Sequence, residues 1–583
     1  MEKRFEINGK TFTFTHEEDV EICFEALPGK EGVSLYKIAF DWGKRVIPKK
    51  IIFEYKFTCR DVYTVWDPLL TDRNVHFNKL TSPSRLAWGI PVKQVQSKSG
   101  NNVHTLALSD VRTPMTLGVG SYPRPNFDKI QVEIVFFTQI CGPFDKYETI
   151  LRIDERANHF SDVLREARAW YDGFGYGAAY SPEYSKVPTY SSWYSLWQSM
   201  TSKQLLKECK EAAKYGMKTV IVDDGWQTDD ATVIYGYVGD WKPVYRKFGD
   251  MKSVVDKVHA MGMKFMLWYA VPFIGYFSKN YKRFKGKYLN LEPGKNGSNC
   301  DSLDPRYKEV RDFITETYVN AVKDWGLDGL KLDFINCFES NGKVTDEMDF
   351  VTVEEATEQL LRDVYEKLTA INPEILLEFR QPYFGPVVNK YGNMIRVWDC
   401  PLGSARNMTC TVDLRLLSGG CSVHSDMIIW AKEDTPESVA SQLWGTMFAV
   451  PQISLRFDDV TLEQKKVLKN YLDFWSAHRE TLLSPNFKPT PSQNGYSYVE
   501  TKLGGEKIAL CNDRGYFETD DQTTEGYMIN NSGHEQTVLK SNKGYSYEIF
   551  DCTGRRVKRK TAVKSTLTEL SVPFGGMLKV EKQ

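Results

Sequence analysis

The sequence predicts a multidomain α/β and β protein: an N-terminal β-sandwich, a central (β/α)8 TIM barrel and a C-terminal antiparallel β-sandwich domain. Apolar residues alternate with period two at both ends of the chain. Between those ends, short apolar runs alternate with amphipathic helical stretches, which indicates parallel βα units. With 583 residues the chain is long enough for these parts. We place them at residues 1–185, including a helical linker, 186–482 and 483–583.

The first part shows alternating strands separated by Gly, Pro, Asn and Asp turns. These strands are expected within residues 5–16, 33–40, 50–58, 103–110 and 131–140. Helical periodicity follows over 159–174, and the stretch 175–188, rich in Gly, Pro, Tyr and Ser, is typical of a linker.

The middle part contains eight apolar runs, the number that a (β/α)8 barrel requires. They lie at residues 189–195, 218–226, 264–273, 329–336, 375–382, 394–400, 421–429 and 451–457. Helices are expected after several of them, for example over 202–216, 250–262 and 463–480. Strands without helical period return at 496–512, 525–532, 545–554 and 566–582.

Composition excludes several function classes. Lys plus Arg number 75 and Asp plus Glu 76, so the balanced charge gives no reason to bind nucleic acid. The N-terminal residues lack the apolar core of a secretory signal and no run approaches 18 apolar residues, so we expect a cytoplasmic protein that does not span a membrane. The eleven cysteines form no Cys-x-x-Cys motif, which favours reduced thiols. With only eight histidines as well, we expect neither a metal nor another cofactor.

Candidate catalytic residues are the polar side chains that close the barrel strands, because active sites of such barrels lie at the carboxyl ends of the strands. Most of them are carboxylates. The set comprises Asp223, Asp224, Trp226, Lys331, Asp333, Glu378, Arg380, Arg396, Asp399, His424 and Asp426. Paired carboxylates with aromatic neighbours suit glycosidic bond chemistry, in which one carboxylate attacks the sugar and a protonated one assists the leaving group.

Two local patterns sharpen this expectation. Strand alternation puts Lys331 and Asp333 on one face, where the cation can keep the carboxylate ionised, although a structural ion pair explains the same pattern. The adjacent Asp223 and Asp224 cannot both face inward along a regular strand, so one turns at the strand end. Beside Trp226, these two acceptors suit vicinal sugar hydroxyls. For Asp426 taken alone, a helix N-cap is the favoured interpretation.

Several motifs together resemble clan-D α-glycosidases, chiefly the α-galactosidases of glycoside hydrolase family 36 and more distantly family 27. VIVDDGW at 220–226 resembles the Asp-Asp-Gly-Trp motif of the family. The stretch that follows it in the family includes Gly-Asp-Trp and resembles VGDWKPVYRKFGDMKSVVDKVHAMGMKFMLW at 238–268, with Asp240 and Trp241. LKLDF at 330–334 is similar to the Lys-x-Asp motif, and IRVWDC at 395–400 resembles the segment that carries the acid/base. The resemblance covers residues 190–480.

The resemblance implies that Asp333 is the nucleophile, that Asp399 is the acid/base and that Asp223 and Asp224 bind the 4- and 6-hydroxyls of galactose. The implied substrate-binding set is Asp223, Asp224, Trp226, Trp241, Trp268, Lys331, Arg380 and Arg396. It also implies a retaining double displacement with the carboxyl groups about 5 to 5.5 Å apart. The acid needs a raised pKa, which burial beside Trp398 or the charge of the nucleophile supplies.

The sequence leaves alternatives open. We expect release of terminal α-linked galactose from small oligosaccharides. The alternatives within the same class are a galactosyl transferase of the raffinose-synthase kind and a hydrolase for α-N-acetylgalactosaminides or β-L-arabinopyranosides. The segments after Trp268 and after Asp399 depart from the pattern of the family, which bears on the substrate. A barrel that binds carbohydrate without catalysis is the alternative from another class, and homo-oligomerisation is left open.

Overall fold

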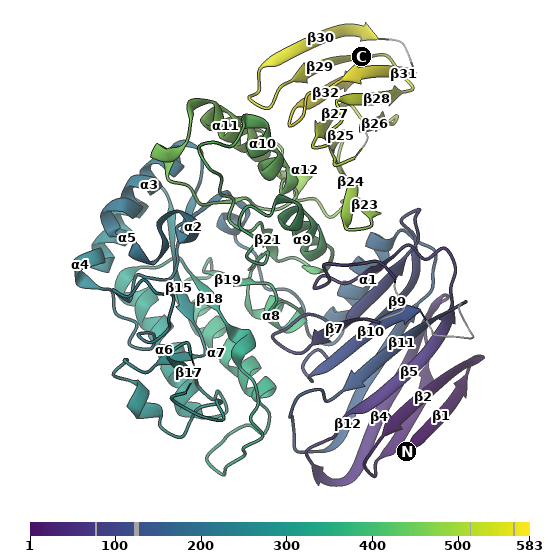
Figure 1. The fold of residues 1–583 in the computed structure, drawn as a ribbon, viewed down its shortest axis with the longest axis vertical. Coiled ribbons are helices and arrows are strands. Elements are labelled where there is room, and N and C mark those ends of the chain that lie inside the picture. The colour runs from purple at the N-terminus through teal and green to yellow at the C-terminus, as the bar shows by residue number, and fades with distance from the viewer. Residues whose placement is uncertain (76–78, 122–127, 296, 514, 564–565, 583) are drawn as a thin grey trace.

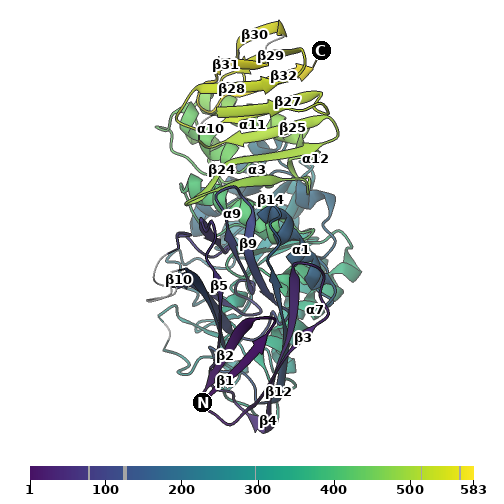
Figure 2. The same cartoon turned by 90° about the vertical axis from the view of Figure 1, so that its right-hand side faces the viewer.

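The structure is a computed structural model that describes residues 1–75, 79–121, 128–295, 297–513, 515–563 and 566–582. It confirms the predicted fold class, with sheets at both ends of the chain and a ring of parallel strands between them (Figure 1). In Figures 1 and 2 the C-terminal sheets lie at one end of the molecule and the N-terminal sheets at the other. Within the described ranges, no helix is both long enough and apolar enough to cross a bilayer.

The N-terminal part consists of two six-stranded sheets that pack face to face. One has the order β1 (Glu2–Ile7), β2 (Lys10–His16), β5 (Ile51–Thr58), β11 (Lys129–Phe136), β10 (Met115–Ser121), β7 (Leu80–Ser84). The other has the order β3 (Glu21–Leu27), β4 (Val33–Val46), β12 (Phe144–Asp154), β9 (Asn102–Leu108), β8 (Val92–Gln96), β6 (Thr64–Trp66). Alternate residues of both sheets, such as Phe12, Phe53 and Ile38, are fully buried between them, as the period-two pattern predicts. Helix α1 (Phe160–Asp172) follows.

Eight parallel strands form the barrel. In ring order they are β13 (Thr189–Ser191), β14 (Thr219–Val222), β15 (Lys264–Ala270), β18 (Gly329–Asp333), β19 (Leu376–Arg380), β20 (Met394–Arg396), β21 (Ser422–His424) and β22 (Gln452–Ile453). β22 pairs with β13, and single bridges joining His424 to Val450 and Ile428 to Ile453 close the ring between β21 and β22. Each strand lies within its predicted run and is shorter than that run, because the residues at the end of the run leave the sheet.

Helices surround the ring of strands. The main ones are α3 (Ser202–Lys214), α5 (Met251–His259), α6 (Lys308–Trp325), α7 (Val353–Ile371), α9 (Ser404–Leu417), α10 (Pro436–Gly445) and α11 (Leu462–Ala477). Helices α3 and α11 both begin with a capping box, Thr201 with Gln204 and Thr461 with Gln464, which satisfies the first free N–H groups.

The C-terminal part holds a seven-stranded sheet and a three-stranded sheet. The first has the order β23 (Lys488–Ser492), β24 (Gly495–Leu503), β25 (Glu506–Cys511), β27 (Glu525–Asn530), β32 (Met577–Lys582), β29 (Tyr545–Phe550), β30 (Arg556–Val563). The second contains β26 (Gly515–Thr519), β28 (Gln536–Ser541) and β31 (Leu567–Ser571). The expectation of purely antiparallel pairing is wrong in two places, because β25 pairs with β27 and β26 with β28 in parallel. The chain crosses between the sheets at β26 and returns in its original direction.

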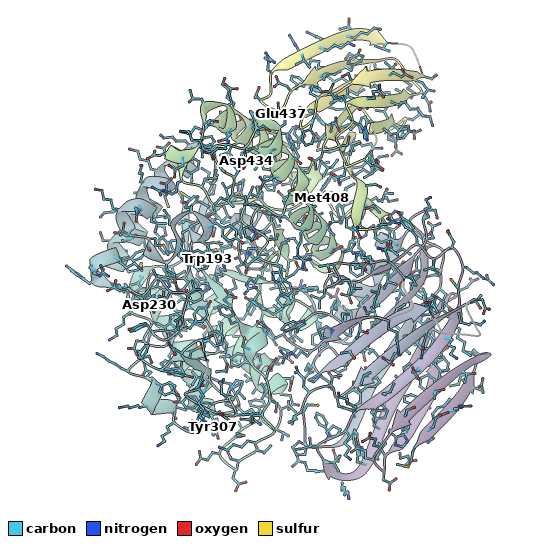
Figure 3. All side chains as sticks on the ribbon, viewed as in Figure 1. Trp193, Asp230, Tyr307, Met408, Asp434 and Glu437 are labelled. Carbon is cyan, nitrogen blue, oxygen red and sulfur yellow. The ribbon has the colours of Figure 1, made fainter. Side chains whose placement is uncertain are left out.

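The three parts meet at helix α9, whose residue Met408 is labelled in Figure 3. Asp413 of this helix is buried and accepts hydrogen bonds from Trp66 at 3.0 Å and from Tyr496 at 2.6 Å, and it also pairs with Arg73. The carboxylate therefore ties strand β6 and the following loop of the first part to strand β24 of the last.

Candidate active site

The strand-closing residues gather at one end of the barrel, as the parallel topology requires. Register places Lys331 opposite Trp268 on one side and opposite Glu378 on the other. Arg380 in turn lies opposite Arg396. Side chains from β14 to β21 therefore face a common space at the carboxyl ends of the strands.

Asp333, the last residue of β18, sits in a dense set of donors. Its Oδ1 accepts from the backbone N–H of Phe334 at 2.9 Å, from Arg380 Nε at 3.0 Å and from the Tyr383 hydroxyl. Among the described residues, Trp268 alone donates to its Oδ2, from Nε1 at 3.0 Å. The side chain is 8% exposed, so the carboxylate is held rigidly and Oδ2 is its less engaged oxygen.

The surroundings of Asp333 keep it ionised. Burial raises the pKa of this carboxyl, but the charges of Arg380 and Lys331 and the hydrogen bonds from Tyr383 and Trp268 outweigh burial. The net pKa lies below its ordinary value. A buried, ionised and oriented carboxylate is what a nucleophile needs.

Asp399 lies three residues beyond β20 and is the more exposed carboxylate, with 39% of its side chain accessible. Arg396 Nη2 donates to its Oδ1 at 2.8 Å, and Arg380 Nη1 lies 3.6 Å from its Oδ2. Burial raises the pKa of Asp399, but the charges of Arg396, Arg380 and Lys331 lower it by more than burial raises it. The net pKa is therefore below the ordinary value. The expected raised pKa is therefore wrong, because two guanidinium groups face the carboxylate.

Lys331 does face the same space as Asp333, but its partner is another carboxylate. Its ammonium lies 2.5 Å from Asp223 Oδ2, and both side chains are 4% exposed. The direct partner of Asp333 is Arg380. Lys331 thus acts on Asp333 through its charge at longer range, as its contribution to the lowered pKa shows.

Asp223 and Asp224 both follow β14 and have different surroundings, as expected of adjacent residues at a strand end. Asp224 accepts from Gln198 Nε2 at 2.6 Å and from Gln227 Nε2 at 2.7 Å. Burial raises its pKa to about 6 against the effect of these two amides. Lys247 donates to the carbonyls of Gln198, Gly225 and Thr228, which fixes the loops that position both amides.

The three predicted indoles form one cluster behind the carboxylates. Trp226 is fully buried, donates to the Trp268 carbonyl at 2.9 Å and stacks on Trp241 with ring centroids 6.0 Å apart. Trp226, expected to bind substrate, therefore supports the other two indoles from behind. Trp268 and Trp241 are 1% and 8% exposed, and Trp268 reaches the site through its N–H to Asp333.

A second charged group is buried behind Asp399. Arg396, 1% exposed, pairs with Asp426 as well as with Asp399, and its Nε lies 3.9 Å from Glu378 Oε1. Burial raises the pKa of Glu378 to about 7, above the ordinary range of a carboxyl. Asp426 also accepts from the Tyr194 hydroxyl at 3.0 Å and caps no helix, which corrects the interpretation as an N-cap.

Several partners of the candidate residues were not expected from the sequence, among them Tyr383, Gln198 and Tyr194. Tyr383 follows β19 in a loop, and Gln198 and Tyr194 lie beyond β13, in the segment that also contains Trp193 (Figure 3). Position just after a barrel strand is the one signal that could have included them. It does not distinguish side chains that turn inward from those that turn outward.

Sequence comparison with known proteins matches part of the chain. The melibiase family model matches residues 186–381. α-Galactosidase Mel36A of Lactobacillus acidophilus is 31% identical over 202 residues, which is 32% of this chain and 26% of that protein. An A type blood α-D-galactosamine galactosaminidase of Flavonifractor plautii is 25% identical over 197 residues, 29% of this chain and 17% of that protein. The matches thus span about a quarter or less of the length of these relatives.

Comparison of structures extends over the whole chain. The family 36 α-galactosidase AgaA of Geobacillus stearothermophilus, solved in complex with stachyose, superposes with a TM-score of 0.61 at 13% identity, covering 98% of this chain and 83% of that one. The chain is thus similar to the melibiase family in the sequence of residues 186–381, and to the α-galactosidases of glycoside hydrolase family 36 in overall fold.

Proposed function

We propose that the protein is a retaining exo-α-galactosidase-like glycoside hydrolase that releases terminal α-linked galactose from small oligosaccharides. The observation that carries the proposal is the placement of Asp333 and Asp399 at one mouth, both beside the guanidinium of Arg380. One carboxylate is buried, ionised and held by four donors, and the other is accessible. This asymmetry fits a nucleophile and an acid/base. The α-galactosidase names of the matched relatives support the same function.

In the first step, Asp333 attacks the anomeric carbon while protonated Asp399 gives its proton to the glycosidic oxygen. The C–O bond to the leaving sugar breaks as the bond to the carboxylate forms, giving a β-linked glycosyl ester. Oδ2 is the attacking oxygen, because Oδ1 already accepts three hydrogen bonds.

In the second step, ionised Asp399 takes a proton from water, whose oxygen attacks the same carbon and releases Asp333. Two inversions at one carbon return galactose with its original α configuration. Before the first step Asp399 must gain a proton. A bound sugar excludes water from its 39% exposed side chain, and that desolvation favours the protonated form.

Sugar recognition falls to the side chains around the carboxylates. Asp223 and Asp224 are both buried and present carboxylate acceptors for hydroxyl groups. Lys331 orients the first of them, and Gln198 and Gln227 orient the second. Loss of either aspartate should chiefly weaken binding of the sugar.

The first test is release of p-nitrophenol from p-nitrophenyl α-D-galactopyranoside by the parent and by Asp333→Asn. We expect turnover by the parent and a loss of about 10⁴-fold or more in the variant, since it lacks the attacking carboxylate. Proton NMR of the first-formed sugar should show α-galactose. β-Galactose as the first product would overturn the retaining mechanism, and equal turnover by the variant would overturn the role of Asp333.

A further inference from the structure

The guanidinium of Arg380 lies between the two carboxylates that the proposed reaction uses. Its Nε is 3.0 Å from Asp333 Oδ1 and its Nη1 is 3.6 Å from Asp399 Oδ2. Nη1 also donates to the Gln381 carbonyl at 3.0 Å. The guanidinium carbon lies 5.2 Å from the centre of the Tyr383 ring and 5.6 Å from the centre of the Phe334 ring. Contacts with these two rings therefore also hold the guanidinium in place.

The third nitrogen of this guanidinium, Nη2, is not used in these contacts. Among the described residues Nη2 donates to no acceptor, and the Arg380 side chain is 11% exposed, slightly more than the 8% of Asp333. The N–H groups on Nη2 are therefore available to a ligand that lies between the carboxylates.

The chemistry of the reaction restricts which part of the sugar Nη2 meets. Asp333 and Asp399 must lie on opposite sides of the anomeric carbon, so a group that contacts both lies beside that carbon. The anomeric carbon has two ring neighbours, the ring oxygen and carbon 2. Positive charge develops at the ring oxygen in the transition state, and a guanidinium there would oppose it. The productive place for Arg380 is therefore beside carbon 2 and its hydroxyl.

We propose that Arg380 is a specificity-determining residue that donates a hydrogen bond to the 2-hydroxyl of the galactoside and disfavours an ammonium group at that position. The inference rests on the proposed function and adds to it a requirement for an uncharged acceptor at carbon 2. It also explains why a cation is tolerated beside an anomeric centre that becomes positive, because hydrogen bonds to the 2-hydroxyl strengthen in the transition state.

The test is a cycle between enzyme and substrate. The kcat/KM values of the parent and of Arg380→Met are measured with p-nitrophenyl α-D-galactopyranoside and with its 2-deoxy analogue. Any general damage to Asp333 or Asp399 affects both substrates and cancels in the ratio, as does the different intrinsic reactivity of the analogue. We expect the galactoside-to-analogue ratio to be about 10- to 100-fold higher in the parent than in the variant, the range of a hydrogen bond from a charged donor.

Two further variants keep the test sharp. Arg380→Lys preserves the charge but not the planar fork, so its ratio should fall toward that of Arg380→Met, and it replaces that variant if Met does not fold. Arg406→Met removes a guanidinium that stands over Trp398 and should keep the parent ratio. Equal ratios in the parent and in the Arg380 variants would overturn the inference while leaving the proposed function intact.

Binding separates the two hypotheses if the parent does not hydrolyse the galactoside. Calorimetric titration of the parent and Arg380→Met with free galactose and 2-deoxygalactose gives the same cycle without turnover. Suppose that the parent binds galactose more tightly than 2-deoxygalactose and that the variant binds the two equally. This result would support the role of Arg380 although hydrolysis had failed. Absence of galactose binding to the parent would overturn both.

Discussion

Lys331 and Asp223 form a buried ion pair across the barrel, with Nζ and Oδ2 2.5 Å apart. The pair joins strand β18 to the end of β14 and leaves Arg380 as the direct partner of Asp333. Lys331 and Arg380 thus contact different carboxylates of the site. Lys331 orients a carboxylate suited to sugar hydroxyls, while Arg380 contacts the carboxylate suited to attack.

Replacing Lys331 by Met should destabilise the fold and weaken sugar binding together. The change leaves Asp223 as an unpaired charge that is 4% exposed, and breaking one side of a buried ion pair costs about 3–5 kcal/mol. Chemical denaturation of the variant and measurement of its KM check both effects.

The matched control for this prediction is the double variant with Asp223→Asn, in which no charge is stranded. We expect the double variant to recover part of the free energy of unfolding that Lys331→Met loses. Strict additivity of the two single effects would show that the ion pair is not an energetic unit.

The acid/base and the nucleophile should give opposite products with azide. In Asp399→Gly, azide can enter the space of the missing side chain, attack the glycosyl ester and yield α-galactosyl azide. In Asp333→Gly, azide replaces the nucleophile and yields β-galactosyl azide. p-Nitrophenyl substrates suit the experiment because their leaving group needs little protonation. NMR of the anomeric proton distinguishes the products, and the reverse pattern would exchange the two assigned roles.

The positions of the site residues could be anticipated because strand physics determines them. Parallel strands expose their carboxyl ends together, and alternation puts Lys331 and Asp333 on one face. The partners could not be anticipated. Tyr383 reaches Asp333 from a loop, where no periodicity sets the direction of a side chain. Trp226 shows the same limit. The sequence pattern of an indole after a strand is the same whether the indole faces a ligand or, as here, the core.

Asp413→Asn should destabilise the contact between the three parts of the chain. The carboxylate is fully buried and compensates the charge of Arg73, whose side chain is 4% exposed. Losing it leaves a buried cation, at a cost of about 3–5 kcal/mol. Thermal unfolding at neutral pH measures the loss. Asp473→Asn, at an exposed pair with Lys469, is the control and should change stability by less than about 1 kcal/mol. Equal effects at both sites would contradict the role of Asp413.

His424 should make the fold sensitive to mild acid. It is fully buried, its Nε2 lies 2.8 Å from the Ser185 carbonyl and its Nδ1 lies 3.3 Å from the Gln452 amide, a pattern that suits a neutral ring. Burial, joined by the charge of Arg396, lowers its pKa to about 4. In the unfolded chain His424 binds a proton near pH 6.5, whereas in the folded chain it binds one only near pH 4. Its contribution is therefore fully present above pH 6.5 and is lost as pH falls through this window.

The size of the effect follows from linkage. A difference of this magnitude between folded and unfolded pKa corresponds to about 3 kcal/mol between pH 6.5 and 4. Urea denaturation across that range should therefore show a steeper loss of stability for the parent than for His424→Gln, which cannot take up the proton. The comparison of slopes is independent of any fixed cost of the substitution. His534→Gln, at an exposed position, should retain the slope of the parent. A parent slope in His424→Gln would assign the acid sensitivity to the buried carboxyls instead.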